Sequence, residues 1–205
     1  MAENIQKHEA ERGRGSAHVY QEILNIPMHG LAILEIGGGP GAVACGFREL
    51  GAGVVAIDLW DGRIFTHPEV GFGVSDARQL PFGDGSFNAA SLTSVLHHIP
   101  VGDTTMALTE ALRVVRPGGL LFIQEEIASQ NFLQNLLMKL VDNLVSGRIG
   151  THQAGAHHSV SGWVAILESF GLRIVGTRYQ NPTWLGLGVK KIFFVLRKPI
   201  CLLTV

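Results

Sequence analysis

The residues LEIGGGPG at positions 34–41 are the strongest indication of the fold of this chain. They complete the apolar run Leu31–Ile36, which predicts a buried strand, and they lead into residues 40–51, which predict a helix with an apolar face. Glycines at such a junction let the backbone turn tightly and let a ligand approach with no Cβ in the way. The stretch therefore predicts a strand–loop–helix unit that binds a ligand at the carboxyl end of the strand.

Outward from this unit, strands and helices alternate along the chain. Further strands are expected at residues 53–57, 70–74, 87–93 and 120–123, and further helices at residues 20–24, 103–115, 131–145 and 161–170, the last capped by Ser161. The alternation predicts a doubly wound α/β domain with a parallel sheet and right-handed crossovers. The last two strands, residues 173–179 and 192–197, have no helix of ordinary length between them, so we expect them to pair antiparallel.

The composition excludes several classes of protein. Apolar residues make up 46% of the 205 residues and charged residues 16%, which favours a sizeable core over disorder. With 16 basic and 17 acidic side chains, the chain has no basic excess, so a nucleic acid is not expected as a partner. No run reaches the roughly 20 apolar residues of a membrane span, and the polar start does not have the pattern of a signal peptide. Cys45 and Cys201 make neither a disulfide framework nor a zinc site, so we expect a cytoplasmic protein.

The glycine loop alone leaves the ligand open. Gly37, Gly39 and Ala42 also satisfy the dinucleotide pattern G-x-G-x-x-A, and Asp58 lies near the distance of a ribose-binding acid, so an NAD(P)-dependent oxidoreductase is one alternative. Glu35 favours a different ligand, because a negative charge there can hold a cationic amino group and would repel a pyrophosphate. Asp76 follows the strand at residues 70–74, where its carboxylate can accept from an adenine amino group.

Four segments in order resemble the successive motifs of class I S-adenosylmethionine-dependent methyltransferases of the small-molecule type. They are LEIGGGPG (34–41), AIDL (56–59), SDARQLPFGDGSFNAASLTSVLHHI (75–99) and RVVRPGGLLFI (113–123). The resemblance covers about residues 31–127 and implies a Rossmann-like, mostly parallel seven-stranded sheet of order 3-2-1-4-5-7-6, with strand 7 antiparallel. Asn88 departs from the family, which more often has an aspartate at that position. The first helix is short, so the sequence does not predict which segment covers the substrate.

The resemblance also implies S-adenosylmethionine as the cofactor and a site for each of its parts. The methionine part would be lined by Glu35, Gly37, Gly38, Gly39 and Gly41, with Ser94 and His97 flanking its end. Asp58 would accept the ribose hydroxyls and Leu59 would pack on the adenine, whose edge Asp76 and Ala77 would bind.

Methyl transfer from a sulfonium needs positioning first, and a base only where the nucleophile must lose a proton. His97 is the candidate base, because it follows the strand at residues 87–93 and imidazole titrates near neutrality; alternatively, it contacts the cofactor or the backbone. The expected substrate contacts are Tyr20, His98, Glu125 and His157. No metal is expected, since the loop with His152, His157 and His158 has no carboxylate or cysteine.

The sequence predicts one domain over residues 1–205 that methylates a small, mostly apolar molecule. Residues 1–30 would form an N-terminal cap, residues 31–127 the cofactor-binding core, and residues 128–205 the substrate-side helices and the last two strands. Besides the oxidoreductase, a cofactor-binding regulatory protein without turnover remains an alternative. The oligomeric state and the acceptor atom stay open.

Overall fold

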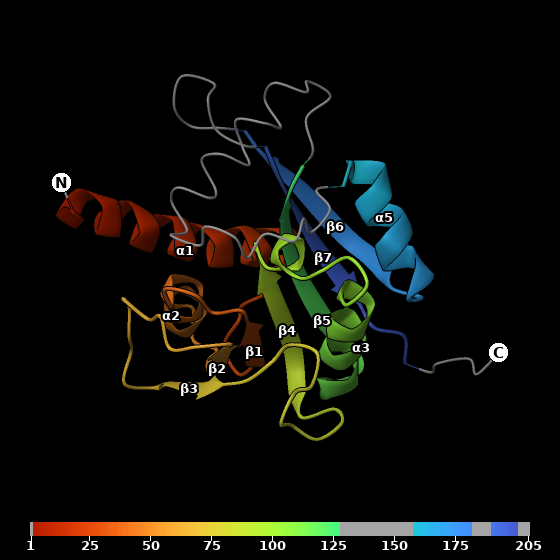
Figure 1. The fold of residues 1–205 in the computed structure, drawn as a ribbon, viewed down its shortest axis with the longest axis horizontal. Helices are drawn as coiled ribbons and strands as arrows, with labels where there is room; N and C mark the ends of the chain where they lie inside the picture. Colours follow the sequence, from red (N-terminus) through yellow and green to blue (C-terminus); the bar gives the residue numbers. More distant parts are fainter. Residues whose placement is uncertain (1, 128–157, 182–189, 201–205) are drawn as a thin grey trace.

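A seven-stranded sheet runs through the protein, with helices on both of its faces (Figure 1). The structure is a computed structural model and describes residues 2–127, 158–181 and 190–200. The strands are β1 (Ala32–Ile36), β2 (Gly53–Asp58), β3 (Val70–Val74), β4 (Phe87–Thr93), β5 (Val115–Glu126), β6 (Arg173–Gln180) and β7 (Lys191–Arg197). The described helices are α1 (Ala2–Leu24), α2 (Ala42–Glu49), the 3-10 helix η1 (Leu96–His98), α3 (Thr104–Val114) and α5 (Val160–Ser169).

The sheet has the order β3-β2-β1-β4-β5-β7-β6, which confirms the predicted topology. Strands β1 to β5 pair in parallel, and β7 lies antiparallel between β5 and β6. The carboxyl ends of the parallel strands therefore meet at one edge of the sheet, where doubly wound proteins bind their ligands. We call this edge the rim.

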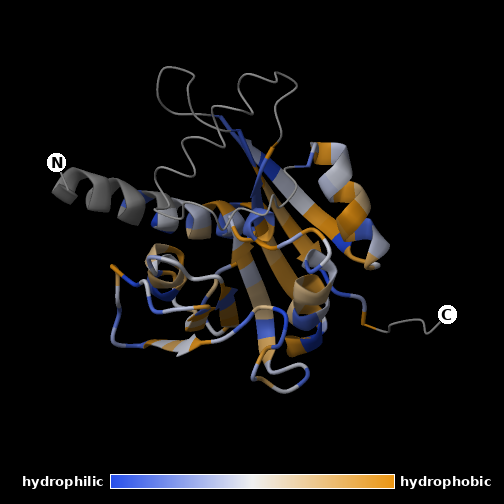
Figure 2. Cartoon of the chain, in the orientation of Figure 1, coloured by the Kyte–Doolittle hydropathy of each residue, from blue (hydrophilic) through white to orange (hydrophobic). Residues whose placement is uncertain are grey.

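Each face of the sheet buries its own apolar cluster. Helices α1 and α2 cover one face, where Tyr20 and Phe47 pack against Phe122 and Phe193. Helices α3 and α5 cover the other face, where Trp163 belongs to the larger cluster. Figure 2 shows the strands in the middle of the sheet as largely hydrophobic, as expected for strands that are buried on both faces.

Three elements differ from the sequence predictions. The first helix runs from Ala2 rather than being confined to residues 20–24, because its polar half is rich in good helix formers although it lacks an apolar stripe. Strand β5 begins at Val115, five residues before the predicted start. Helix α5 is capped by Ser159 rather than Ser161: Ser159 has an extended backbone, and its Oγ accepts from the Gly162 N–H at 3.1 Å. The predicted helix at residues 131–145 lies outside the described residues.

Candidate functional site

A cavity of about 910 Å³ opens at the rim of the sheet. Its described walls come from α1, from the loop after β1, from the ends of β2 to β5 and from the start of β7. Ten of the residues predicted for the site line it: Glu35, Gly37, Gly38, Gly39, Asp58, Leu59, Asp76, Ala77, Ser94 and His98. The predicted grouping of the glycine loop with the ends of β2, β3 and β4 is therefore what the structure shows.

The glycine loop packs tightly against the neighbouring turn. Gly37 has φ of +73°, and a Cβ placed on it would lie 2.4 Å from a methyl carbon of Val95, so only glycine fits there. The N–H groups of Gly37 and Gly38 both donate to the carbonyl of Ile57, at 2.9 and 2.8 Å. Gly41 does not line the cavity; it caps α2 and donates its N–H to the Gly38 carbonyl. The loop is thus fixed from both sides, and Gly38 and Gly39 border the cavity.

Glu35 brings a buried carboxyl group to the floor of the cavity. Its exposed fraction is 1%, and burial raises its pKa well above the ordinary value, although a hydrogen bond with Ser91 acts in the opposite direction. Among the described residues, no hydrogen-bond partner lies within reach of its Oε2 atom. A buried carboxyl oxygen without a partner is costly, so a cationic or hydrogen-bond-donating ligand at this atom would be favoured.

Asp58 ends β2 with both carboxylate oxygens oriented by backbone groups. Its Oδ2 accepts from the Gly39 N–H at 2.8 Å, and its Oδ1 accepts from the Leu59 N–H at 2.7 Å. Each oxygen keeps a further lone pair for a ligand. Leu59 beside it exposes 58% of its surface, although it is a large apolar residue. A carboxylate next to an exposed apolar side chain suits a ribose and the flat ring attached to it.

The Asp76 carboxylate is less available to a ligand than the sequence predicts. The Arg78 guanidinium beside it makes an ion pair at 2.7 Å and holds the pKa of the Asp76 carboxyl below its ordinary value. Arg78 also reaches Asp103 at the start of α3. Since both Asp76 and Arg78 line the cavity, a ligand at this end would meet a carboxylate already bound to a cation.

The opposite end of the cavity has a hydrogen-bonded row of polar residues that sequence reasoning missed. Ser16 of α1 donates to Gln124 Oε1 at 2.9 Å, and Gln124 Nε2 donates to Ser94 Oγ at 2.7 Å. Lys191 Nζ reaches the same Ser94 oxygen at 3.4 Å. We call Ser16, Gln124, Ser94 and Lys191 the polar row. The signal that could have found it is the period-two alternation of β5 and β7, which places Gln124 on the face of Phe122 and Lys191 on the face of Phe193.

Ser94 occupies an unusual backbone position in this row. Its φ is +56°, in the left-handed region that a non-glycine residue adopts at a cost of about 1–3 kcal/mol. Its N–H donates to the Gln124 carbonyl at 2.8 Å, so Gln124 holds both the main chain and the side chain of Ser94.

Three predicted residues lie behind the cavity wall rather than on it. Tyr20 is fully buried among Phe47, Phe122 and Phe193, and its hydroxyl bonds Thr93 Oγ1 at 3.2 Å, so it is not placed to touch a substrate. His97 and Glu125 are buried on the face covered by α3 and α5, where His97 Nδ1 lies 2.6 Å from Glu125 Oε2. The reason is again alternation, since Glu125 points to the face opposite Gln124.

His98 lines the cavity, and the His97 ring packs against it at a centroid distance of 4.0 Å. His157 and His152 lie outside the described residues. Within the described part of the chain, no three His, Cys, Asp or Glu side chains are grouped to hold a metal ion, and no helix there is long and apolar enough to cross a membrane.

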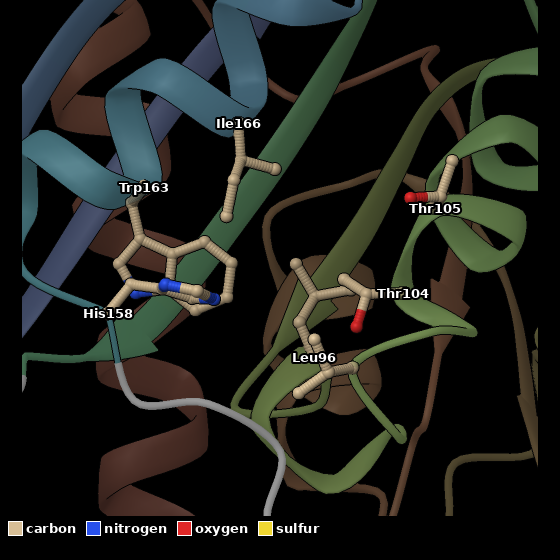
Figure 3. A pocket seen from close by; sticks show the side chains of 7 residues that line it. Leu96, Thr104, Thr105, His158, Trp163 and Ile166 are labelled. Atoms are coloured by element: carbon tan, nitrogen blue, oxygen red, sulfur yellow. The ribbon is translucent and has the colours of Figure 1, made fainter.

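A second, smaller cavity of about 200 Å³ lies between η1, α3 and α5. Figure 3 shows Trp163 and Ile166 of α5 facing Leu96 and Thr104 across it, with His158 beside Trp163. The His158 and Trp163 rings meet edge to face at 4.8 Å. Leu96 and Val101 border this cavity while Val95 and Pro100 border the larger one, so the turn after β4 separates the two.

Comparison with known proteins agrees with this geometry. Residues 34–123 match the family described as "Methyltransferase domain". A demethylmenaquinone methyltransferase of Beutenbergia cavernae is 34% identical over 100 residues, which are 47% of this chain and 41% of that protein. An uncharacterized methyltransferase of Mycobacteroides abscessus is 29% identical over 115 residues, or 50% and 42% of the two chains. The chain thus spans less than half the length of these relatives.

Two solved structures share the fold. A 1,6-didemethyltoxoflavin-N1-methyltransferase of Burkholderia thailandensis, solved with bound 1,6-didemethyltoxoflavin and S-adenosylhomocysteine, superimposes with a TM-score of 0.68 at 18% identity, covering 91% of this chain and 78% of that one. An S-adenosylmethionine-dependent methyltransferase of Mesorhizobium loti gives a TM-score of 0.66 at 18% identity, with coverages of 88% and 96%.

The sheet order, the glycine loop and the rim cavity define a doubly wound protein with a cavity at the carboxyl ends of its strands. Residues 34–123 are similar to the family described as a methyltransferase domain, and the fold is that of solved S-adenosylmethionine-dependent methyltransferases. The fold predicted from the four motifs is therefore confirmed, and the match of residues 34–123 agrees with the predicted family.

Proposed function

We propose that this chain binds S-adenosylmethionine in the rim cavity and transfers its methyl group to a small molecule. The observation that carries the proposal is Glu35, which lines the cavity next to the glycine loop and whose buried Oε2 atom has no partner among the described residues. The match of residues 34–123 to a methyltransferase domain supports the reaction. Residues 31–127 would bind the cofactor, and the segments on either side would complete one domain.

The residues present fit each part of this cofactor. Glu35 would bind the ammonium group of the methionine part, where a cation relieves the cost of a buried carboxylate. Asp58 would accept the two ribose hydroxyls and Leu59 would cover one face of the adenine. Ala77 and Asp76 would contact the adenine edge, with Arg78 keeping Asp76 ionised.

When bound, the cofactor supplies an activated methyl group: the acceptor's electron pair forms the new bond to carbon, and the carbon–sulfur pair stays on sulfur, which leaves as a neutral thioether. The chain's own residues then have to orient the acceptor and exclude water. The side chain best placed to take a proton from the acceptor is His98, because it lines the cavity while His97 does not. Glu125 and His97 would position this turn rather than touch the acceptor.

Calorimetric titration tests the cofactor assignment directly. S-adenosylhomocysteine should bind with micromolar affinity, whereas NADH should give no heat of binding, because NADH has no ammonium group to pair with the buried Glu35. Tight NADH binding would instead support an oxidoreductase. A panel of phenols, carboxylic acids, amines and thiols with labelled cofactor then tests transfer; binding without transfer to any acceptor would favour the regulatory alternative.

A further inference from the structure

The polar row presents two hydrogen-bond donors to the cavity at the side away from Asp58. Ser94 Oγ accepts from Gln124 Nε2 at 2.7 Å and from Lys191 Nζ at 3.4 Å, which uses its acceptor positions and leaves the hydroxyl proton to be donated. In this orientation Gln124 accepts from Ser16 at its Oε1 and presents its Nε2 to Ser94, so the Ser94 proton is available to a ligand. The second donor is the Lys191 ammonium group.

Lys191 is held at the rim of the sheet. It begins β7, pairs in register with Glu126 of β5, and its Nζ lies 4.0 Å from Glu126 Oε1. Its side chain is only 15% exposed, so the ammonium group acts in a partly water-excluded cavity, where a charge-assisted hydrogen bond is stronger than at the surface.

We propose that Ser94 and Lys191 form an oxyanion-binding subsite, and that the acceptor binds there through a negatively charged oxygen of a carboxylate or an acidic hydroxyl group. This inference rests on the proposed function for the identity of the cavity, and it names the class of acceptor. A hydroxyl acceptor bound there would ionise more readily, because Lys191 stabilises its anion. The methyl group would then be received by this oxygen, whose proton has already left to solvent or to His98.

The position of the subsite distinguishes it from the cofactor's own groups. Glu35 stands on β1, and the glycine loop and Asp58 lie at the ends of β1 and β2. Lys191 Nζ contacts residues at the ends of β4 and β5, one and two strands further along the sheet. Adjacent strands lie about 4.8 Å apart, so the subsite lies on the acceptor side of the cofactor's ammonium group.

Two ligands of the same shape test the subsite on the intact chain. Protein saturated with S-adenosylhomocysteine is titrated with naphthoate and with its neutral amide, naphthamide. The wild-type protein should bind naphthoate about tenfold more tightly. Lys191→Met should remove this preference, Lys191→Arg should retain most of it, and Ser94→Ala should reduce it.

Lys190→Met is the matched control, because Lys190 is the exposed neighbour of Lys191 and does not line the cavity. This variant should behave as the wild-type protein does.

Equal affinity of the wild-type protein for the two ligands, or no binding of either, would overturn the proposal, and so would a preference that survives in Lys191→Met. If Lys191→Met weakened S-adenosylhomocysteine by tenfold or more, Lys191 would bind the cofactor's carboxylate and the acceptor subsite would be wrong. If the wild-type protein failed to bind S-adenosylhomocysteine, the proposed function would fail, while the naphthoate titration of the free protein would still test the subsite.

Discussion

Two buried carboxyl groups lie on opposite faces of the same sheet and differ in what surrounds them. Glu125 on β5 has an exposed fraction of 0%, and both of its oxygens are bonded: Oε1 accepts from the N–H groups of Val95 and Leu96, and Oε2 pairs with His97. Glu35 on β1 is equally buried, but it lines the cavity and its Oε2 atom has no partner in the described part of the chain.

The difference separates a structural acid from a ligand-binding acid. Burial by itself does not distinguish them, because both groups have lost their water. The hydrogen bonds do: both oxygens of Glu125 bind groups of the turn after β4, whereas Glu35 has an oxygen that no described residue satisfies and that a ligand can reach through the cavity. Removing Glu125 should therefore damage stability, and altering Glu35 should damage ligand binding.

The largest effect is expected from Glu125→Ala. The substitution leaves two buried N–H groups and His97 without their acceptor, so the free energy of unfolding should fall by about 3 kcal/mol. Urea denaturation of the free protein measures this loss. Glu125→Gln keeps an oxygen for the two N–H groups and should lose about 1 kcal/mol. A loss below about 1 kcal/mol for the alanine variant would contradict a structural role for Glu125.

Glu35→Gln should give the reverse pattern. An amide resembles the protonated carboxyl group that burial favours, so the free energy of unfolding should change by less than about 1 kcal/mol. Affinity for S-adenosylhomocysteine should nevertheless fall at least about tenfold, because a charge-assisted hydrogen bond of roughly 1.5–3 kcal/mol is lost. Calorimetric titration and urea denaturation of the same preparation give both numbers. Unchanged affinity would mean that Glu35 does not bind the ammonium group.

Asp58→Ala extends the comparison to a carboxylate that is only half-buried. Both of its oxygens already accept from loop N–H groups, which water can replace at the open rim, so the fold should survive. Losing the two ribose bonds should weaken S-adenosylhomocysteine about tenfold. Asp61→Ala is the matched control: Asp61 lies three residues along the same loop, pairs with Arg63 and does not line the cavity. Equal effects of the two substitutions would remove Asp58 from the ribose site.

The contrast between the two glutamates also shows how far the sequence could lead. The position of Glu35 at the cavity could be predicted, because Glu35 belongs to the same strand–loop motif as the glycines that follow it. The fold was predictable for the same reason, together with the missing helix between the last two strands. Glu125 was predicted to contact the substrate but lies behind the cavity wall, because a shift of one residue along a strand reverses the face. Tyr20 on α1 and His97 on η1 also lie behind the wall, because the sequence gives the place of a residue near the rim but not the direction of its side chain. Lys191 was missed because it begins a strand that reaches the site only through pairing with β5.

The smallest and most specific effect concerns pH. Burial raises the pKa of Glu35 in the free protein above its ordinary value of 4.5, so the folded state binds a proton more tightly than the unfolded state does. The resulting stability is fully present below the unfolded pKa and is lost as pH rises through the folded pKa. Urea denaturation should show this loss in the wild-type protein and not in Glu35→Gln.

Ligand binding should respond to pH in the opposite direction. An ammonium group at Oε2 favours the ionised carboxylate, so binding S-adenosylhomocysteine should expel the proton of Glu35 wherever the free protein holds it. Affinity should therefore fall as pH drops below the raised pKa, by at most about tenfold per pH unit. Titration in two buffers of different ionisation enthalpy measures the proton directly: the wild-type protein should release up to one more proton than Glu35→Gln. The same release from both proteins would mean that Glu35 binds its ligand without changing charge, and the contrast with Glu125 would then rest on hydrogen bonds alone.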